Sequence, residues 1–183
     1  MRRLSSAVSY GWAWPNSVAR PGVVKRPHST RLPMLTGIGV GQRENATPAY
    51  DWISFTFTTA FPSYDLRWVD QLTAGGRRGP VRVEGNTILR IRFAGAEAHD
   101  ESGSTVRNAP PTHIGYRAIT SCVQTGDSAG VVTYGVGNDQ SIADTHPQPQ
   151  IRAVEITAAD GLGGYLYIVA IDIQTRATVG RQR

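Results

Sequence analysis

Strict alternation of apolar and polar side chains restricts the middle of this chain to β structure. In "DWISFTFTT", residues 51–59, isoleucine and two phenylalanines occupy every second position, with serine and threonine between them. Successive side chains of a strand point to opposite faces. The segment therefore predicts a strand that buries Ile53, Phe55 and Phe57 and turns Trp52 the other way.

The same pattern recurs in short segments bounded by turn residues such as "TGDS" and "ADGLGG". The predicted strands are residues 35–41, 51–59, 64–70, 81–83, 87–93, 117–124, 129–137, 150–157 and 165–173. The last segment is apolar on both faces through Ala170, which is typical of a central strand. About nine short strands without a capped helical segment indicate a β-sandwich or barrel. Residues 94–116 lack periodicity and predict one long irregular loop.

Charge is distributed unevenly along the chain. Residues 1–34 carry six basic and no acidic side chains and are interrupted by four prolines, so we expect a disordered basic tail there. Residues 35–174 carry 10 basic and 14 acidic side chains. We predict one folded domain at 35–175 and a short C-terminal tail at 176–183. Because the domain has no net basic charge, we expect no nucleic-acid partner.

Other features exclude further classes of protein. No run approaches the 18 or so apolar residues of a membrane-spanning helix, and no signal-peptide core or lipobox cysteine is visible. The one cysteine, Cys122, allows no intrachain disulfide, and its alternate spacing in "RAITSCVQ" predicts core packing.

"AGAEAHDESG", residues 94–103, holds the densest cluster of ionisable groups, with Glu97, His99, Asp100 and Glu101. Side chains two apart on an extended chain lie about 6.5–7 Å apart, and those four apart lie about 13 Å apart. One stretch therefore does not converge its own carboxylates on a metal, and the adjacent acids point apart instead of forming an acid–base pair. We expect a polar loop in which His99 and Asp100 hydrogen-bond the loop backbone, with a ligand role as second choice.

No other segment carries a catalytic pattern. The chain has no G-x-S-x-G elbow, and its glycine-rich turns lack the strand–turn–helix context of a phosphate loop. The other histidines of the predicted domain, His113 and His146, lie in irregular proline-containing stretches without metal-ligand spacing. We therefore predict no catalytic residue, cofactor or metal.

The predicted binding residues are selected for polarity and exposure. They are Trp52, Arg67, Asp70, His99 and Asp100.

An ordered series of motifs resembles the AMIN-like domain of actinobacterial cell-envelope proteins, many of them lipoproteins. "LTGIGVGQREN" with "YDWISFTF" is similar to the opening strands of that family, and "AEAHDESG" is similar to its "A-x-A-H-D-x-x-G" signature. "FPSYDLRWVDQL", "GPVRVEGNTILRIRF", "TGDSAGVVTYGVGNDQ", "IRAVEIT" and "YLYIVAIDI" follow in the family's order. The similarity covers about residues 35–173. Ser128 and Ala129 replace the family's aromatic–acid pair, "DTHPQPQ" replaces a short connection, and "ADGLGG" lengthens the last hairpin.

The resemblance implies a β-sandwich related to the AMIN domain of periplasmic amidases, a targeting module that associates with the cell wall. It implies an extracytoplasmic setting and no catalytic residues. We therefore predict an all-β sandwich of about nine mostly antiparallel strands. Its expected role is a non-enzymatic module that binds peptidoglycan or an envelope protein. Two alternatives remain: a protein-interaction module acting through an exposed strand edge, and a hydrolase using His99 with nearby carboxylates.

Overall fold

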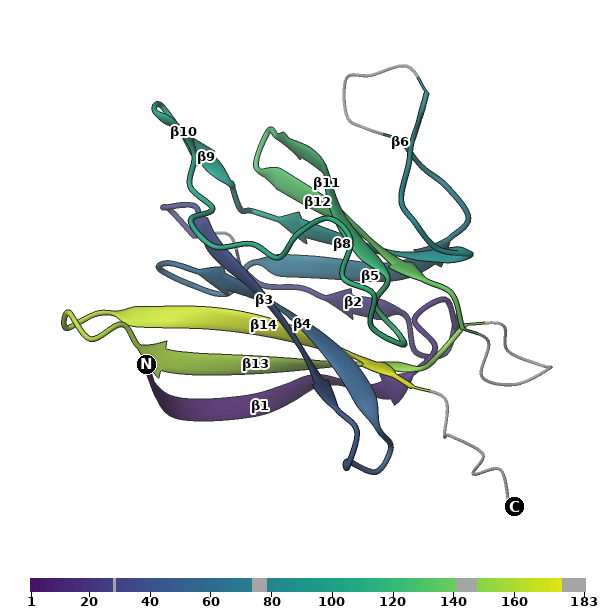
Figure 1. The fold of residues 1–183 in the computed structure, drawn as a ribbon. Helices are drawn as coiled ribbons and strands as arrows, with labels where there is room; N and C mark the ends of the chain where they lie inside the picture. The colour runs from purple at the N-terminus through teal and green to yellow at the C-terminus, as the bar shows by residue number, and fades with distance from the viewer. Residues whose placement is uncertain (28, 74–78, 141–147, 176–183) are drawn as a thin grey trace, which may run out of the picture.

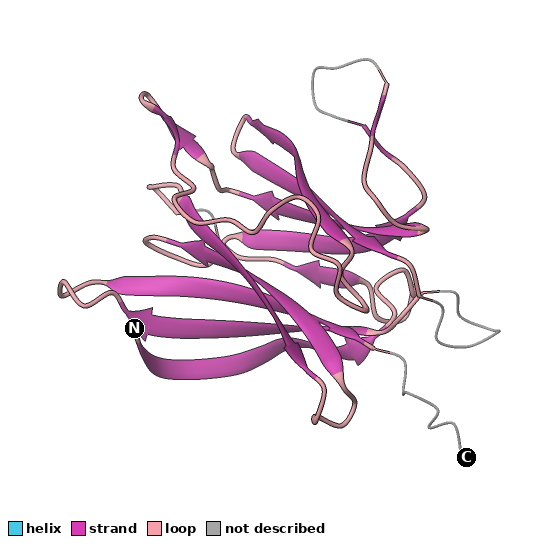
Figure 2. Ribbon diagram, in the orientation of Figure 1, coloured by secondary structure: helices cyan, strands magenta, loops and turns pink. Residues whose placement is uncertain are grey.

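Two five-stranded antiparallel sheets pack face to face in the computed structural model, which describes residues 1–27, 29–73, 79–140 and 148–175 (Figures 1 and 2). The first sheet has the order β1 (Arg2–Ala13), β13 (Ile151–Ala159), β14 (Tyr165–Gln174), β4 (Tyr50–Phe57) and β3 (Leu35–Arg43). The second has the order β11 (Ser121–Ser128), β12 (Val131–Asn138), β8 (Thr87–Ala94), β5 (Ser63–Val69) and β2 (Gly22–Val24). The predicted all-β sandwich is confirmed.

Two short strand pairs stand outside these sheets. They are β6 (Leu72–Thr73) with β7 (Pro80–Val81), and β9 (His99–Asp100) with β10 (Gly103–Ser104). Among the described residues no helix is long and apolar enough to cross a bilayer.

Aromatic rings join the two sheets. The ring centroid of Phe93, on β8, lies 4.9 Å from those of both Phe55 and Phe57 on β4, and 6.2 Å from that of Tyr64 on β5. All four side chains are buried. Edge-to-face contacts of this kind add to the stability gained by burying the rings. The alternation in β4, β5 and β8 therefore correctly predicted the inner faces of both sheets.

The N-terminal segment differs from its prediction. Residues 1–34, expected as a disordered tail, contribute β1 to the edge of the first sheet and β2 to the edge of the second. The first seven residues of β1 are exposed, and only Tyr10 and Ala13 are buried. An edge strand with so little buried surface needs no hydrophobic alternation, because its backbone hydrogen bonds to β13 hold it. The four prolines and the acid-free composition of residues 1–34 therefore led to the wrong prediction.

A buried polar network fastens this segment to the sandwich. Glu155 of β13 faces the core with 7% exposure and accepts a hydrogen bond from the Tyr64 hydroxyl at 3.1 Å. Arg26, just after β2, pairs with the same carboxylate, and Ser9 of β1 is hydrogen-bonded to the Tyr64 hydroxyl. Burial raises the pKa of Tyr64, which keeps the hydroxyl protonated as a donor. The network thus links β1, β2, β5 and β13.

Several element boundaries also differ from the predictions. The strand predicted at 117–124 lies at 121–128, so "TGDS" is strand and the turn is at Ala129 and Gly130, which both have positive φ. The predicted irregular loop at 94–116 contains the β9–β10 hairpin. Of the strand predicted at 81–83, only Val81 is in a strand. The turn "GGRRGP" lies partly, and the tail 176–183 wholly, outside the described residues.

We predict that Phe93→Ala lowers the free energy of unfolding by about 3–5 kcal/mol, because it removes a fully buried ring that contacts both sheets. Urea denaturation measures the change. Phe93→Leu, which refills part of the volume, should lose clearly less. An alanine variant as stable as the parent would contradict the role of Phe93 in the core.

We also predict that Tyr64→Phe costs about 1–3 kcal/mol of unfolding free energy, because the buried Glu155 carboxylate loses a donor. Tyr167→Phe is the matched control, because the Tyr167 hydroxyl makes no hydrogen bond with the described residues. Equal losses in the two variants would show that the network does not stabilise the fold.

Candidate functional site

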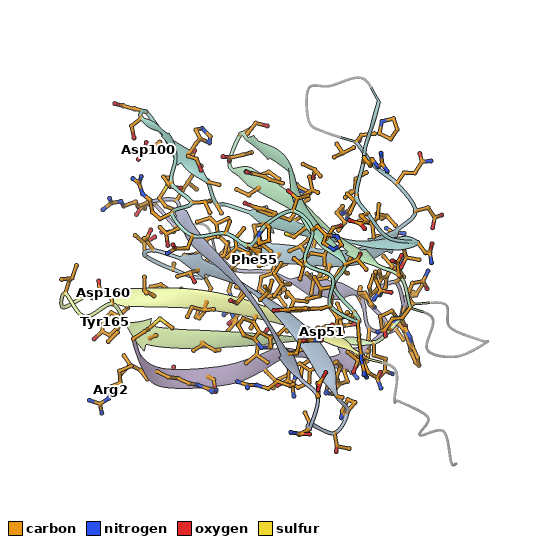
Figure 3. The ribbon with its side chains drawn as sticks, viewed as in Figure 1. Arg2, Asp51, Phe55, Asp100, Asp160 and Tyr165 are labelled. Atoms are coloured by element: carbon orange, nitrogen blue, oxygen red, sulfur yellow. The ribbon has the colours of Figure 1, made fainter. Side chains whose placement is uncertain are left out.

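The structure separates the five predicted binding residues. Trp52 lies on the outer face of the first sheet, whereas Arg67 is exposed on β5 of the second sheet and Asp70 follows that strand. His99 and Asp100 lie on the β9–β10 hairpin, where Figure 3 labels Asp100 far from the centre of the first sheet. No single site contains all five.

Trp52 borders a hollow of about 360 Å³ on the outer face of the first sheet, which we call the outer-face hollow. Its floor is the middle of β13 and β14, formed by Val154, Ile156, Ile168 and Ala170. Its rim side chains come from five strands and from the residue before β1. They are Met1, Arg3 (β1), Arg43 (β3), Tyr50, Trp52 and Ser54 (β4), Arg152 (β13) and Asp172 (β14). The hollow is therefore an apolar floor edged by aromatic and charged groups.

Glycines of β3 set the position of the Trp52 ring. Gly41 pairs with Trp52, and a Cβ added at Gly41 would lie only 2.5 Å from ring atoms. A Cβ at Gly39 would lie 3.4 Å from the same ring. The alternate glycines in "GIGVG" thus let the indole lie across β3. A side chain at position 41 would push the ring away from the strand.

Arg152 organises the end of the hollow. Its guanidinium pairs with Asp172, at 2.6 Å from Nη2 and 2.8 Å from Nε to Oδ2. The same guanidinium lies 4.9 Å from the Trp12 ring centroid and 5.1 Å from that of Tyr50. Burial raises the pKa of Asp172, and Arg152 opposes that shift. The two rings and the carboxylate therefore hold the Arg152 side chain in place from three strands.

Sequence reasoning missed most of this cluster. The spacing of Tyr50 and Trp52 places both rings on the outer face of β4, and that signal was readable. Trp12, Arg152 and Asp172 come from distant segments, and only the strand order β1–β13–β14–β4 brings them together. Trp12 was assigned to a tail because its segment shows no alternation.

The His99 and Asp127 side chains connect two motifs that lie 28 residues apart. Nδ1 of His99 is 2.6 Å from Oδ2 of Asp127 at the end of β11, and Asp127 Oδ1 accepts a hydrogen bond from the backbone N–H of Ala98 at 3.2 Å. The hydrogen bond and negative charge of Asp127 raise the pKa of His99. His99 thus bonds to a side chain instead of the predicted loop backbone, and Asp127 makes the backbone contact.

Asp100 forms a local turn, as predicted from its hydrogen-bonding preference. Its Oδ1 accepts from the Ser102 backbone N–H at 2.8 Å and from the Ser102 hydroxyl at 2.5 Å. These bonds lower the pKa of Asp100. Its carboxylate is used to shape the hairpin.

A second, larger hollow of about 450 Å³ lies beside the β3–β4 turn and contains the buried carboxylate of Asp51. Asp51 Oδ2 accepts from the Ala118 N–H at 2.5 Å, and Oδ1 accepts from Gln42 at 3.1 Å. Burial raises the pKa of Asp51, and these donors oppose the shift. The Ala118 bond joins β4 to the segment before β11, so this carboxylate has a structural role.

The described residues show no cluster of metal ligands. They contain no group of three or more His, Cys, Asp or Glu side chains that could hold a metal ion. His146 lies outside them. Burial raises the pKa of Cys122 to about 12, and the side chain packs against the core as predicted, so it remains a thiol.

The raised pKa of His99 gives a prediction for pH dependence. When the folded pKa exceeds the unfolded one, the stability from protonation is fully present below the unfolded pKa and is lost as pH rises through the folded pKa. NMR titration of the His99 ring should give a midpoint above that of an unperturbed histidine, and Asp127→Asn should return it toward that value. An identical midpoint in both proteins would show that Asp127 does not control His99.

Comparison with known proteins identifies the family. A family model described as the AMIN-like domain matches residues 33–147. No curated protein and no solved structure matches the chain. AMIN-like domains are in general non-catalytic, extracytoplasmic modules associated with the cell envelope and its peptidoglycan. Because the match spans more than half of the 183 residues, this protein belongs to the AMIN-like domain family.

Proposed function

We propose that this protein is a non-catalytic binding module that acts outside the cytoplasm and holds peptidoglycan in the outer-face hollow. The observation that carries the proposal is the cluster of rings and charges around Arg152. Ligand sites combine apolar and aromatic surface with a few polar groups that fix orientation. The floor of β13 and β14, the Trp52 and Tyr50 rings, and the Arg152–Asp172 pair supply both.

The chemistry of a sugar suits this surface. A pyranose ring presents C–H groups on its faces and hydroxyls around its rim. The faces pack on aromatic rings, while the rim hydroxyls exchange hydrogen bonds with a guanidinium and a carboxylate. Because the Arg152–Asp172 pair is already ordered by Trp12 and Tyr50, little conformational entropy is lost when a ligand binds.

A protein-interaction role has one supporting observation. β1 ends the first sheet, and Leu4 and Val8 on it are 48% and 58% exposed. However, Arg2 and Arg3 on the same strand and its three register shifts are features that discourage pairing with another edge. We therefore place an envelope-protein partner at β1 second to a glycan in the hollow.

The hydrolase alternative would depend on His99. It has a carboxylate partner in Asp127, but the pair joins the β9–β10 hairpin to the end of β11, and neither residue lines the outer-face hollow. We propose that the pair orders the hairpin and takes no part in binding.

We predict that purified sacculi retain the parent protein and retain Trp52→Ala at least tenfold less well, a loss of about 1.4 kcal/mol or more. Gly41→Ala, which displaces the ring without removing it, should weaken retention in the same direction. Co-sedimentation measures both, with thermal melts to confirm folding.

The matched control for Trp52 is Tyr165→Ala, because Tyr165 is a 57% exposed aromatic residue that does not line the hollow. It should leave retention unchanged. If folded Trp52→Ala binds as well as the parent, or if Tyr165→Ala loses as much, the outer-face hollow is not the glycan site.

A further inference from the structure

The charges around the outer-face hollow do not balance. Three arginines line it, Arg3, Arg43 and Arg152, against one acid, Asp172. Residues 35–174 as a whole carry more acidic than basic side chains. Residues 1–34, which also belong to the sandwich, add six basic side chains, so the net positive charge of the hollow is a property of its own lining residues.

Two of these arginines retain their charge for a ligand. Arg152 is neutralised by Asp172. Arg3 makes its hydrogen bond to the uncharged hydroxyl of Ser6, and Arg43 makes no side-chain hydrogen bond or salt bridge with the residues the structure describes. Both Arg3 and Arg43 are exposed, so they can meet an incoming anion without first breaking a salt bridge.

The two free charges lie at opposite ends of the hollow. Arg3 bonds Ser6, which pairs with Ile156 and through it with Ile168. Arg43 pairs with Tyr50, whose ring centroid lies 5.1 Å from the Arg152 guanidinium, and that guanidinium is paired with Asp172. Ile168 and Asp172 are four residues apart on β14, or about 13 Å along the strand. A small anion contacts only one of these arginines, whereas an extended ligand with spaced acidic groups contacts both.

We propose that the outer-face hollow selects glycan segments bearing carboxylates, with Arg3 and Arg43 each neutralising one carboxylate and the Trp52 face packing on the sugar between them. This inference rests on the proposed function and assigns the charge of its ligand. The carboxylates are those of the peptides attached to the peptidoglycan strand. Because both arginines are exposed, salt screens the attraction, and retention falls as ionic strength rises.

The test compares arginine variants on three preparations of sacculi. The variants are Arg3→Gln, Arg43→Gln and the double variant, with the double lysine variant to keep the charge. Arg82→Gln with Arg92→Gln is the matched control, because both arginines are exposed and neither lines the hollow. The sacculi are untreated, amidated at their carboxyl groups, or stripped of phosphodiester-linked polymers with hydrofluoric acid.

On untreated sacculi we expect the double glutamine variant to lose at least tenfold in retention at low salt, and the lysine and control variants to stay close to the parent. Amidated sacculi should lose the parent protein to a similar degree, and stripped sacculi should keep it. Thermal melts confirm that each variant is folded.

Three results would overturn the inference. Undiminished binding of the parent to amidated sacculi would exclude carboxylates as the recognised groups. Loss of binding on stripped sacculi would show that the arginines recognise phosphate. An equal loss of retention in the control variant would show that only the overall charge of the protein matters. Failure of the proposed function is distinguishable. If the proposed function is wrong, untreated sacculi do not retain the parent protein, or they retain Trp52→Ala equally well. If only this inference is wrong, retention still depends on Trp52 but is unchanged by the Arg3 and Arg43 substitutions.

Discussion

The double-sided apolar character of β14 is the constraint on which the rest of the structure depends. Its inner side chains, among them Val169 and Ile171, fill the core opposite the second sheet, while Ile168 and Ala170 form the floor of the outer-face hollow. A strand that is apolar on both faces must be flanked by strands on both edges and covered on both faces. β13 and β4 supply the edges. The outer face is covered only by side chains from the rim, which leaves a shallow apolar surface edged by polar groups.

The N-terminal strand completes that rim. β1 brings Arg3 and Trp12 to the outer face, and it is held in place from the inner side by the Ser9, Tyr64 and Glu155 network. The family match starts after β1 and ends before β13. Three of the strands that build the hollow, β1, β13 and β14, therefore lie outside the matched region, and so do Arg152 and Asp172. The surface that we propose for binding combines β3 and β4, inside the matched region, with β1, β13 and β14, outside it.

Sequence reasoning succeeded where burial imposes a period of two. It placed the inner faces of β4, β5 and β8 and the central position of β14, because each buries large side chains at alternate positions. It failed where strands bury little: β1 is exposed over most of its length, and the "TGDS" segment has turn-forming residues that pairing with β12 holds in a strand. Of the five predicted site residues only Trp52 reached the outer-face hollow, because single-residue polarity and exposure do not encode which distant strands become neighbours.

The buried carboxylates of the described residues are engaged in bonds that hold the fold together. Asp51 is held by Ala118 and Gln42, Glu155 by Tyr64 and Arg26, and Asp172 by Arg152. Each of these carboxylates accepts a hydrogen bond from a donor within the fold. One of these bonds also orders a side chain at the outer-face hollow, that of Arg152. Asp172 fixes Arg152, Arg152 is stacked by the rings of Trp12 and Tyr50, and the rigid edge so formed faces the hollow. The buried acids thus stabilise the sandwich and, through Arg152, give the outer face a preorganised polar group that a glycan can meet at little entropic cost.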